Sequence, residues 1–232
     1  MPVPHEDLKE IEKLPIFPLP LVLMPNEVLP LHIFEPRYRE MLADVQNSTG
    51  LFGVSYFETE GHPAEHPDVG SVGCVAEIRD VQMLEDGRAN IITTGKVRYR
   101  ILEYSESDEP YLVARVDVFH DEAGSGEEIA AKADQVFTLF ERIAKAAFEL
   151  GGASGPLPAI KRSDPESLSF LVSTSLDLSN QLKYEYLEMT STSERLERLR
   201  LVLIEAVDRM EENAEVTKAA KTNGHSKKKL EL

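Results

Sequence analysis

The fold is decided by residues 14–42, LPIFPLPLVLMPNEVLPLHIFEPRYREML. Two apolar runs interrupted by prolines come first, Leu14–Met24 and Val28–Phe34. They predict irregular or edge strands, because proline cannot donate a hydrogen bond to a sheet ladder. Pro36 then suits the first turn of a helix whose apolar stripe comprises Tyr38, Met41, Leu42 and Val45. The stretch therefore predicts two strands followed directly by a helix.

Strand-like patterns continue to about residue 120. Runs rich in β-branched and aromatic residues predict strands at Leu51–Phe57, Gly73–Leu84, Ala89–Tyr104 and Tyr111–His120. Asp86-Gly87 separates two of these runs and predicts a tight hairpin, because such turns need positive φ. Gly73 and Gly95 lie inside predicted strands and indicate bulges or bends, which help a sheet to curl into a barrel.

Beyond the linker at residues 121–126 the apolar spacing becomes helical. One long amphipathic helix is predicted over residues 129–148, and it ends at Gly151-Gly152. Further helix starts are predicted at residues 163–166, Ser179 and residues 191–194. The sequence therefore predicts an α+β protein with a β-rich part over residues 1–120 and a helical bundle over residues 121–213.

Charge is unevenly distributed along the chain. The 232 residues carry 41 Asp and Glu against 25 Lys and Arg, a formal net charge of −16. Five lysines and one glutamate give the end from Lys218 onward a net charge of +4, which leaves −20 on residues 1–217. Residues 214–232 are expected to form a disordered basic tail. The acidic body argues against binding nucleic acid or an anionic membrane surface.

Cysteine content and hydropathy indicate a cytoplasmic protein. Cys74 is the only cysteine, so the chain forms no internal disulfide and no thiolate metal cluster. The apolar runs are too short to span a bilayer, and the acidic start MPVPHEDLKEIEK has no apolar signal core.

Signals for catalysis are weak. The sequence has neither a phosphate-binding glycine loop nor a G-x-S-x-G elbow. Ser154 lies in a glycine-rich connector. A catalytic Ser–Lys pair would need a lysine in an apolar pocket, but the nearest lysine, Lys161, lies beside Arg162 in a polar stretch. His62 and His66 have i, i+4 spacing, but the prolines beside them favour an open loop over a metal site. We therefore expect no catalytic residue, metal or cofactor.

Residues 14–42, followed by LFGVSYF, VGSVGCVAEI and LEDGRANIITTGKVRYRI, resemble the N-terminal substrate-recognition domain of Lon proteases. The likeness is strongest to bacterial proteins in which this domain stands alone, and it extends over roughly residues 12–210, including KYEYLEMTSTSERLERL. It implies a PUA-like pseudo-barrel of about six strands with one helix, then a helical bundle. It also implies that the ATPase and Ser–Lys peptidase parts of Lon are missing here. The Lon-like part of cereblon, which serves protein contacts, is similar too.

The resemblance implies a non-catalytic module that recognises unfolded or client polypeptides, with a protease or chaperone as a further candidate partner. Candidate peptide-binding residues are Leu23, Met24, His32, Phe34, Glu35, Arg37 and Tyr38. Leu23 and Met24 would offer an adaptable apolar surface. Glu35 and Arg37 flank Pro36, where they either fix the strand–helix corner or contact the ligand.

The corner itself is expected to turn Phe34, Tyr38 and Leu42 into the barrel end and to leave Arg37 and Arg39 outside. Two other functions stay open. One is an ATP-independent peptidase that uses Ser154 or the His62/His66 loop, and the other is a PUA-like RNA-binding protein.

Overall fold

The computed structural model describes residues 11–58, 66–122, 124–150 and 160–223. The chain forms two compact units. The first comprises Met1–Ala123 and Phe170–Ser191, and the second comprises Gly124–Ser169 and Thr192–Leu232.

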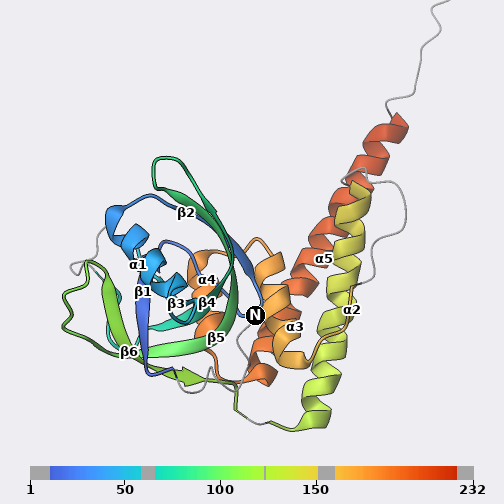
Figure 1. Cartoon of the computed structure of the whole chain (residues 1–232). Coiled ribbons are helices and arrows are strands. Elements are labelled where there is room, and N and C mark those ends of the chain that lie inside the picture. The colour runs from blue at the N-terminus through green and yellow to red at the C-terminus, as the bar shows by residue number, and fades with distance from the viewer. Residues whose placement is uncertain (1–10, 59–65, 123, 151–159, 224–232) are drawn as a thin grey trace, which may run out of the picture. The chain divides into compact units, whose positions relative to one another are not determined.

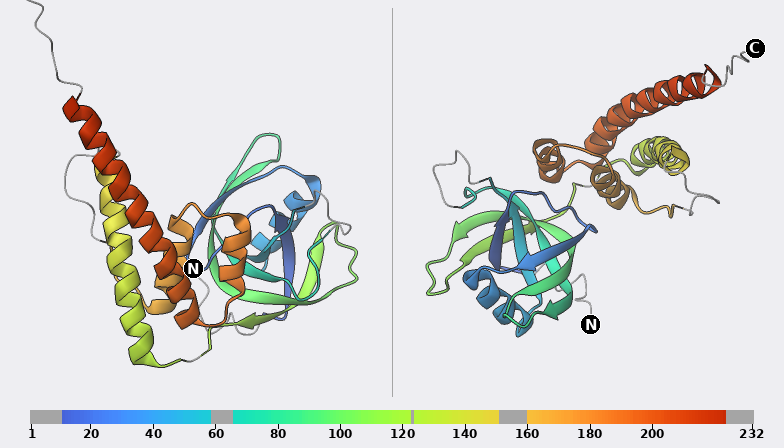
Figure 2. Two further views of the ribbon diagram at one scale, coloured as in Figure 1. Left: turned by 180° about the vertical axis from the view of Figure 1, so that it is seen from behind. Right: turned by 90° about the horizontal axis from the view of Figure 1, so that it is seen from above.

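A mixed six-stranded sheet dominates the first unit (Figure 1). Its strands are β1 (Lys13–Leu19), β2 (Val28–Ile33), β3 (Leu51–Tyr56), β4 (Val72–Met83), β5 (Ala89–Tyr104) and β6 (Leu112–Phe119), with α1 (Pro36–Gln46) after β2. The strand order is β2-β5-β4-β3-β1-β6, and a further pairing of β5 with β6 closes a ring. Strand β2 lies outside this ring and pairs with β5 among the described strands. The curled sheet and α1 are seen again in Figure 2.

Strand β1 corrects one expectation. It lies between β3 and β6 and is not an edge strand, although it contains Pro15 and Pro18. Its pairing with β6 covers Lys13–Ile16 and its pairing with β3 covers Ile16–Leu19. At Pro15 only β6 is paired, and the proline nitrogen points to the β3 side. At Pro18 only β3 is paired, and the nitrogen points to the β6 side. Neither proline therefore costs the sheet a hydrogen bond.

The hairpin predicted at Asp86-Gly87 is confirmed. Gly87 has φ +79°, and the carboxylate of Asp86 accepts a hydrogen bond from the backbone N–H of Arg88 at 3.1 Å. A register shift between β4 and β5 lies beside Gly95, as expected for a bulge.

Gly73 lies one residue before the same register shift, which begins at Cys74, and it has a second role in the core. It faces the ring of buried Tyr99, and a Cβ atom at Gly73 or Gly53 would lie 2.5 Å from the Tyr99 oxygen. These two glycines make room for Tyr99, whose hydroxyl hydrogen-bonds that of Ser55 at 2.7 Å. This part of the barrel core is thus built around one large ring with a polar tip.

Four helices follow the sheet: α2 (Gly126–Leu150), α3 (Pro165–Ser175), α4 (Asn180–Glu188) and α5 (Thr192–Asn223). Helices α2 and α5 pack against each other in the second unit (Figure 1). Helix α4 belongs to the first unit, which differs from one bundle over residues 121–213. The α+β class is confirmed, and the bundle is partly supported by these helices.

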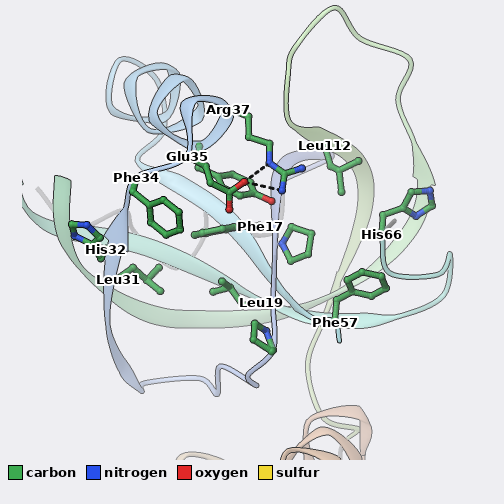
Figure 3. A pocket seen from close by; sticks show the side chains of 13 residues that line it. Phe17, Leu19, Leu31, His32, Phe34, Glu35, Arg37, Phe57, His66 and Leu112 are labelled. Atoms are coloured by element: carbon green, nitrogen blue, oxygen red, sulfur yellow. Dashed lines mark hydrogen bonds and ion pairs between the residues drawn. The ribbon is translucent and has the colours of Figure 1, made fainter. Parts of the chain in front are cut away.

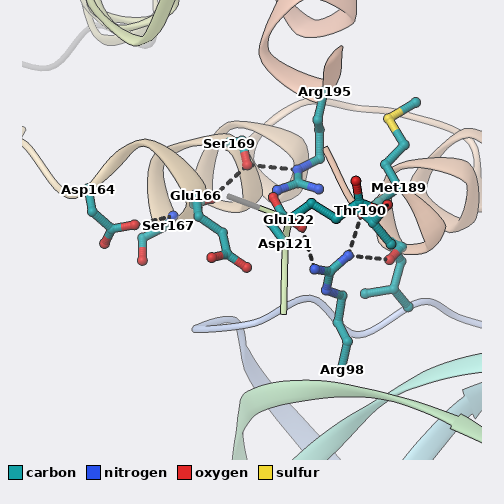
Figure 4. A network of polar contacts seen from close by, with 11 residues as sticks. Arg98, Asp121, Glu122, Asp164, Glu166, Ser167, Ser169, Met189, Thr190 and Arg195 are labelled. Atoms are coloured by element: carbon teal, nitrogen blue, oxygen red, sulfur yellow. Dashed lines mark hydrogen bonds and ion pairs between the residues drawn. The ribbon is translucent and has the colours of Figure 1, made fainter. Parts of the chain in front are cut away.

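Buried polar contacts explain why α4 belongs with the barrel. Arg98 of β5 is 1% exposed, donates to the Leu187 carbonyl at 3.1 Å and also bonds the Met189 carbonyl and the Asp121 carboxylate (Figure 4). The hydroxyl of Tyr184 accepts a hydrogen bond from the Val72 N–H at 3.1 Å. Residues 180–189 are therefore tied to the sheet by groups that sequence periodicity does not reveal.

The last helix extends further than expected. It runs to Asn223, whereas a disordered tail was predicted from residue 214. The added turns contain the good helix formers Ala, Glu and Lys, whose high helix propensity favours a longer helix. Residues 224–232 lie outside the described residues.

Two clusters of buried side chains form the barrel core. One gathers around α1 and includes Phe17, Tyr38, Met41, Leu42 and Phe52. The other surrounds Tyr99 and includes Leu14, Ile16, Val75 and Ile101. None of the helices, over the residues described, combines the length and the apolar character needed to cross a membrane.

Candidate functional site

An open pocket of about 500 Å³ lies in the first unit, beside the start of α1 (Figure 3). Strands β1 and β2 flank it. Its lining comprises Phe17, Pro18, Leu19, Pro20, Leu31, His32, Phe34, Glu35, Arg37, Tyr38, Phe57, His66 and Leu112. Figure 3 shows Phe34 and Leu31 on the β2 side and Leu19 on the β1 side. The surface is mainly apolar, with charged and imidazole groups among the lining residues.

The strand–helix corner supplies the polar part of the lining. Glu35 is the N-cap residue of α1, and Pro36 occupies the first turn. The Glu35 side chain makes no capping hydrogen bond and pairs instead with the Arg37 guanidinium at 3.0 Å. Both side chains are about half exposed, so the pair contributes little to stability. The two side chains thus pair with each other at the strand–helix corner, and their contact with a ligand stays a prediction.

Tyr38 forms the floor of the pocket at this corner. It is 7% exposed, and its ring centroid lies 4.2 Å from that of Phe17. Burial raises the pKa of Tyr38 above its usual value, an effect that the neighbouring charge of Arg37 opposes. Tyr38 is therefore a neutral phenol at physiological pH. The Arg37 guanidinium lies 4.6 Å from the centre of the same ring, as in a cation–π contact.

Each imidazole of the pocket already has a neighbour. His32 Nδ1 lies 2.7 Å from the Asn90 side-chain oxygen, and the His32 ring stacks on Phe34 at 6.0 Å. His66 Nδ1 lies 2.9 Å from the Pro67 carbonyl, and its ring packs against Tyr104 at 4.4 Å. Within the described part of the chain, His, Cys, Asp and Glu side chains form no group of three or more suited to a metal ion.

Phe34 corrects the predicted orientation of the corner. The sequence predicts that Phe34 points into the barrel end together with Tyr38 and Leu42, but the Phe34 side chain is 58% exposed. Tyr38 and Leu42 are buried as expected. Phe34 follows the last residue of β2, Ile33, whose side chain takes the buried position. An exposed aromatic ring at the mouth of an apolar pocket is therefore the most prominent apolar feature of the site.

The structure brings together five of the seven predicted site residues: His32, Phe34, Glu35, Arg37 and Tyr38. Leu23 and Met24 are not among them, because they are 2% and 0% exposed. The chain turns inward after β1, so these residues fill the barrel core and offer no surface.

No local sequence signal marks the pocket wall opposite β2. It consists of Phe17, Pro18, Leu19 and Pro20, with Phe57, His66 and Leu112 nearby. The run LPIFPLPL is apolar throughout, but the pairing of β1 decides which of its residues face the pocket. Ser154 and His62, the other candidates, lie outside the described residues.

The fold and the pocket define a class: a small β-barrel domain that carries an open apolar pocket. The family model of the ATP-dependent protease La (LON) substrate-binding domain matches residues 13–205, and the chain belongs to this family. The resemblance expected from residues 14–42 is thus confirmed.

Two curated relatives show the extent of the similarity. Lon protease 2 of Syntrophobacter fumaroxidans is 30% identical over 203 residues, which cover 86% of this chain and 25% of the relative. The Lon protease of Flavobacterium johnsoniae is 31% identical over 204 residues, covering 83% of this chain and 24% of the relative. The chain therefore spans about a quarter of the length of these relatives.

Solved structures share the fold. The Lon N-terminal domain protein from Xanthomonas campestris superposes with a TM-score of 0.59 at 23% identity, covering 82% of this chain and 97% of that one. The N-terminal domain of Mycobacterium avium complex Lon protease gives a TM-score of 0.58 at 19% identity, covering 81% and 96%.

Proposed function

We propose that the protein is a non-catalytic, cytoplasmic recognition module that binds unfolded polypeptide segments in the pocket beside α1. The observation that carries the proposal is the pocket itself, an apolar hollow with the exposed ring of Phe34 at its mouth. Exposed apolar surface of this kind is typical of sites that bind other molecules. The family's description as a substrate-binding domain supports a polypeptide as the ligand.

The state of the polar groups in the pocket favours binding over catalysis. Glu35 is paired with Arg37, His32 lies against Asn90, and the raised pKa of Tyr38 keeps its phenol protonated. A general base needs a free lone pair within reach of its substrate, and a nucleophile needs an activating neighbour. These groups instead shape the rim of an apolar surface.

A matched pair of variants tests the proposal. Phe34 and Met83 are 58% and 61% exposed in the same unit, and of the two only Phe34 lines the pocket. We expect wild-type protein to bind fluorescent, reduced and alkylated lysozyme and not native lysozyme. Phe34→Ser should weaken this binding about tenfold through lost apolar burial, while Met83→Ser changes it less than about twofold. Equal effects of the two substitutions would contradict the location of the site.

The RNA-binding alternative predicts a different result in the same assay. Phosphate contacts lose affinity steeply with salt, whereas apolar contacts do not. We expect binding of the unfolded polypeptide to persist as salt is raised, with slower association because the acidic body no longer steers basic segments. A higher affinity for single-stranded RNA than for unfolded polypeptide at equal salt would favour the alternative.

A further inference from the structure

Strand β2 presents a free backbone edge to the pocket. Its residues Val28–Ile33 pair with β5 and, among the described strands, with no other. A free strand edge carries unpaired N–H and C=O groups that another strand can join. The residues at the end of this edge, Leu31, His32 and Phe34, are also pocket-lining residues.

The hydrogen-bond register identifies which groups face outward. The Gly95 N–H donates to the Glu27 carbonyl, so the backbone N–H and C=O groups of the odd-numbered β2 residues point toward β5. The backbone N–H and C=O groups of the even-numbered residues therefore point away from β5, along the free edge. Pro30 is one of them, which explains how β2 holds a proline without losing a ladder bond. Val28 and His32 each supply an N–H and a C=O to the edge, and Pro30 supplies a C=O alone.

The opposite wall of the pocket is also an incomplete strand edge. The pairing of β6 with β1 ends at Ile16, opposite Leu112, while β1 continues to Leu19. Pro18 lies in this continuation and faces the side that β6 has left, so its carbonyl is turned toward the pocket while its nitrogen carries no hydrogen. Two strand edges thus flank an apolar hollow, and their spare groups are mainly acceptors, with the N–H groups of Val28 and His32 as donors.

These features select the class of ligand. Backbone acceptors beside apolar side chains are matched by another extended backbone, whose N–H groups recur along one edge while its side chains alternate between faces. We propose that an extended polypeptide segment adds as a strand to the free edge of β2 and places an apolar side chain against Phe17, Leu19 and Tyr38. This inference rests on the proposed function and specifies the geometry of binding. It also predicts tolerance of sequence, because main-chain hydrogen bonds do not depend on side-chain identity.

Backbone-methylated peptides test the geometry on the wild-type protein. The probe is a dye-labelled peptide of about eight residues in which Leu alternates with Thr between terminal lysines. Two further peptides carry N-methyl groups on every Leu or on every Thr, which blocks one edge or the other of the extended chain. We expect the parent peptide to bind, one methylated peptide to bind comparably and the other to lose at least about tenfold in affinity. Equal affinities for the two methylated peptides would overturn strand addition, whereas failure of the parent peptide would overturn the proposed function itself.

A pair of substitutions tests the edge from the protein side. His32→Pro removes the outward N–H, while His32→Ala removes the same side chain and keeps that donor. We expect His32→Pro to weaken parent-peptide binding about tenfold more than His32→Ala. Equal affinities of the two variants would overturn the role of the edge. Sedimentation of the free protein provides the remaining test, because a dimer that His32→Pro abolishes and His32→Ala retains would assign the edge to a second copy of the chain and overturn the proposal.

Discussion

Replacing Tyr38 by alanine should lower the free energy of unfolding by about 3 kcal/mol. The ring is 7% exposed and packs on Phe17 at 4.2 Å, so the substitution empties an aromatic site in the core cluster around α1. Losses of about 3–5 kcal/mol are typical for such sites. We expect the lower end, because the vacated space adjoins the pocket and can fill with water.

Arg39→Ala is the control for this prediction. Arg39 is on the same helix, but its side chain is exposed, so the loss should stay below about 0.5 kcal/mol. Urea denaturation followed by circular dichroism measures both variants, and the slopes should match that of the wild type. Similar losses for the two variants, or a larger loss for Arg39→Ala, would refute the orientation of the corner and the role of Tyr38 as the pocket floor.

Three further results are expected. Burial raises the pKa of the Cys74 thiol to about 12 from the usual 9.0, so the thiol should resist alkylation at pH 8 until urea unfolds the protein. The contribution of the buried thiol to stability should be complete below pH 9 and decline as the pH rises toward 12. Rapid alkylation of the native protein would contradict this. Arg98→Ala should cost about 3–5 kcal/mol in urea because it removes a buried positive charge beside the Asp121 carboxylate together with hydrogen bonds to the Leu187 and Met189 carbonyls. Arg115→Ala, whose exposed pair with Glu103 is solvated, should cost less than about 1 kcal/mol. The purified protein should hydrolyse neither ATP nor casein, and a casein-cleaving activity that disappears in Ser154→Ala would overturn the non-catalytic proposal.

Much of the fold could be predicted because its signals are local. The Asp86-Gly87 turn needs positive φ, and Gly87 adopts it. Ser179 was expected to begin a helix, and its side chain accepts a hydrogen bond from the Leu182 N–H at 3.3 Å. The stripe Tyr38, Met41, Leu42 and Val45 is buried as its spacing predicts. Each of these features depends on residues that lie within a few positions of one another.

The errors concern long-range pairing. Proline content suggested that β1 is an edge strand, but its partners change at Ile16, so both prolines are accommodated inside the sheet. Leu23 and Met24 are buried because the chain turns into the barrel after β1. The assignment of α4 to the first unit depends on Arg98, which lies about ninety residues earlier in the chain. No local pattern encodes such partners.

The candidate site shows the same division. His32, Phe34, Glu35, Arg37 and Tyr38 follow one another across the strand–helix corner, so they could be identified as a group. Phe17, Leu19, Phe57 and Leu112 come from three other segments and meet them only through the closure of the barrel. Whether residues 1–120 and 121–213 fold as separate units stays a prediction, which limited proteolysis can test.

Photo-cross-linking tests the central claim most directly. An unfolded polypeptide carrying a benzophenone at one apolar position is irradiated with the protein, and the cross-linked residues are identified by mass spectrometry. We expect the links to fall on pocket-lining residues and to disappear when an excess of unlabelled peptide is added. These residues are 17–20 and 57 together with Leu31, His32, Phe34, Glu35, Arg37 and Tyr38. Links spread over both units, or concentrated on α2 and α5 and unaffected by the competitor, would contradict recognition through this pocket.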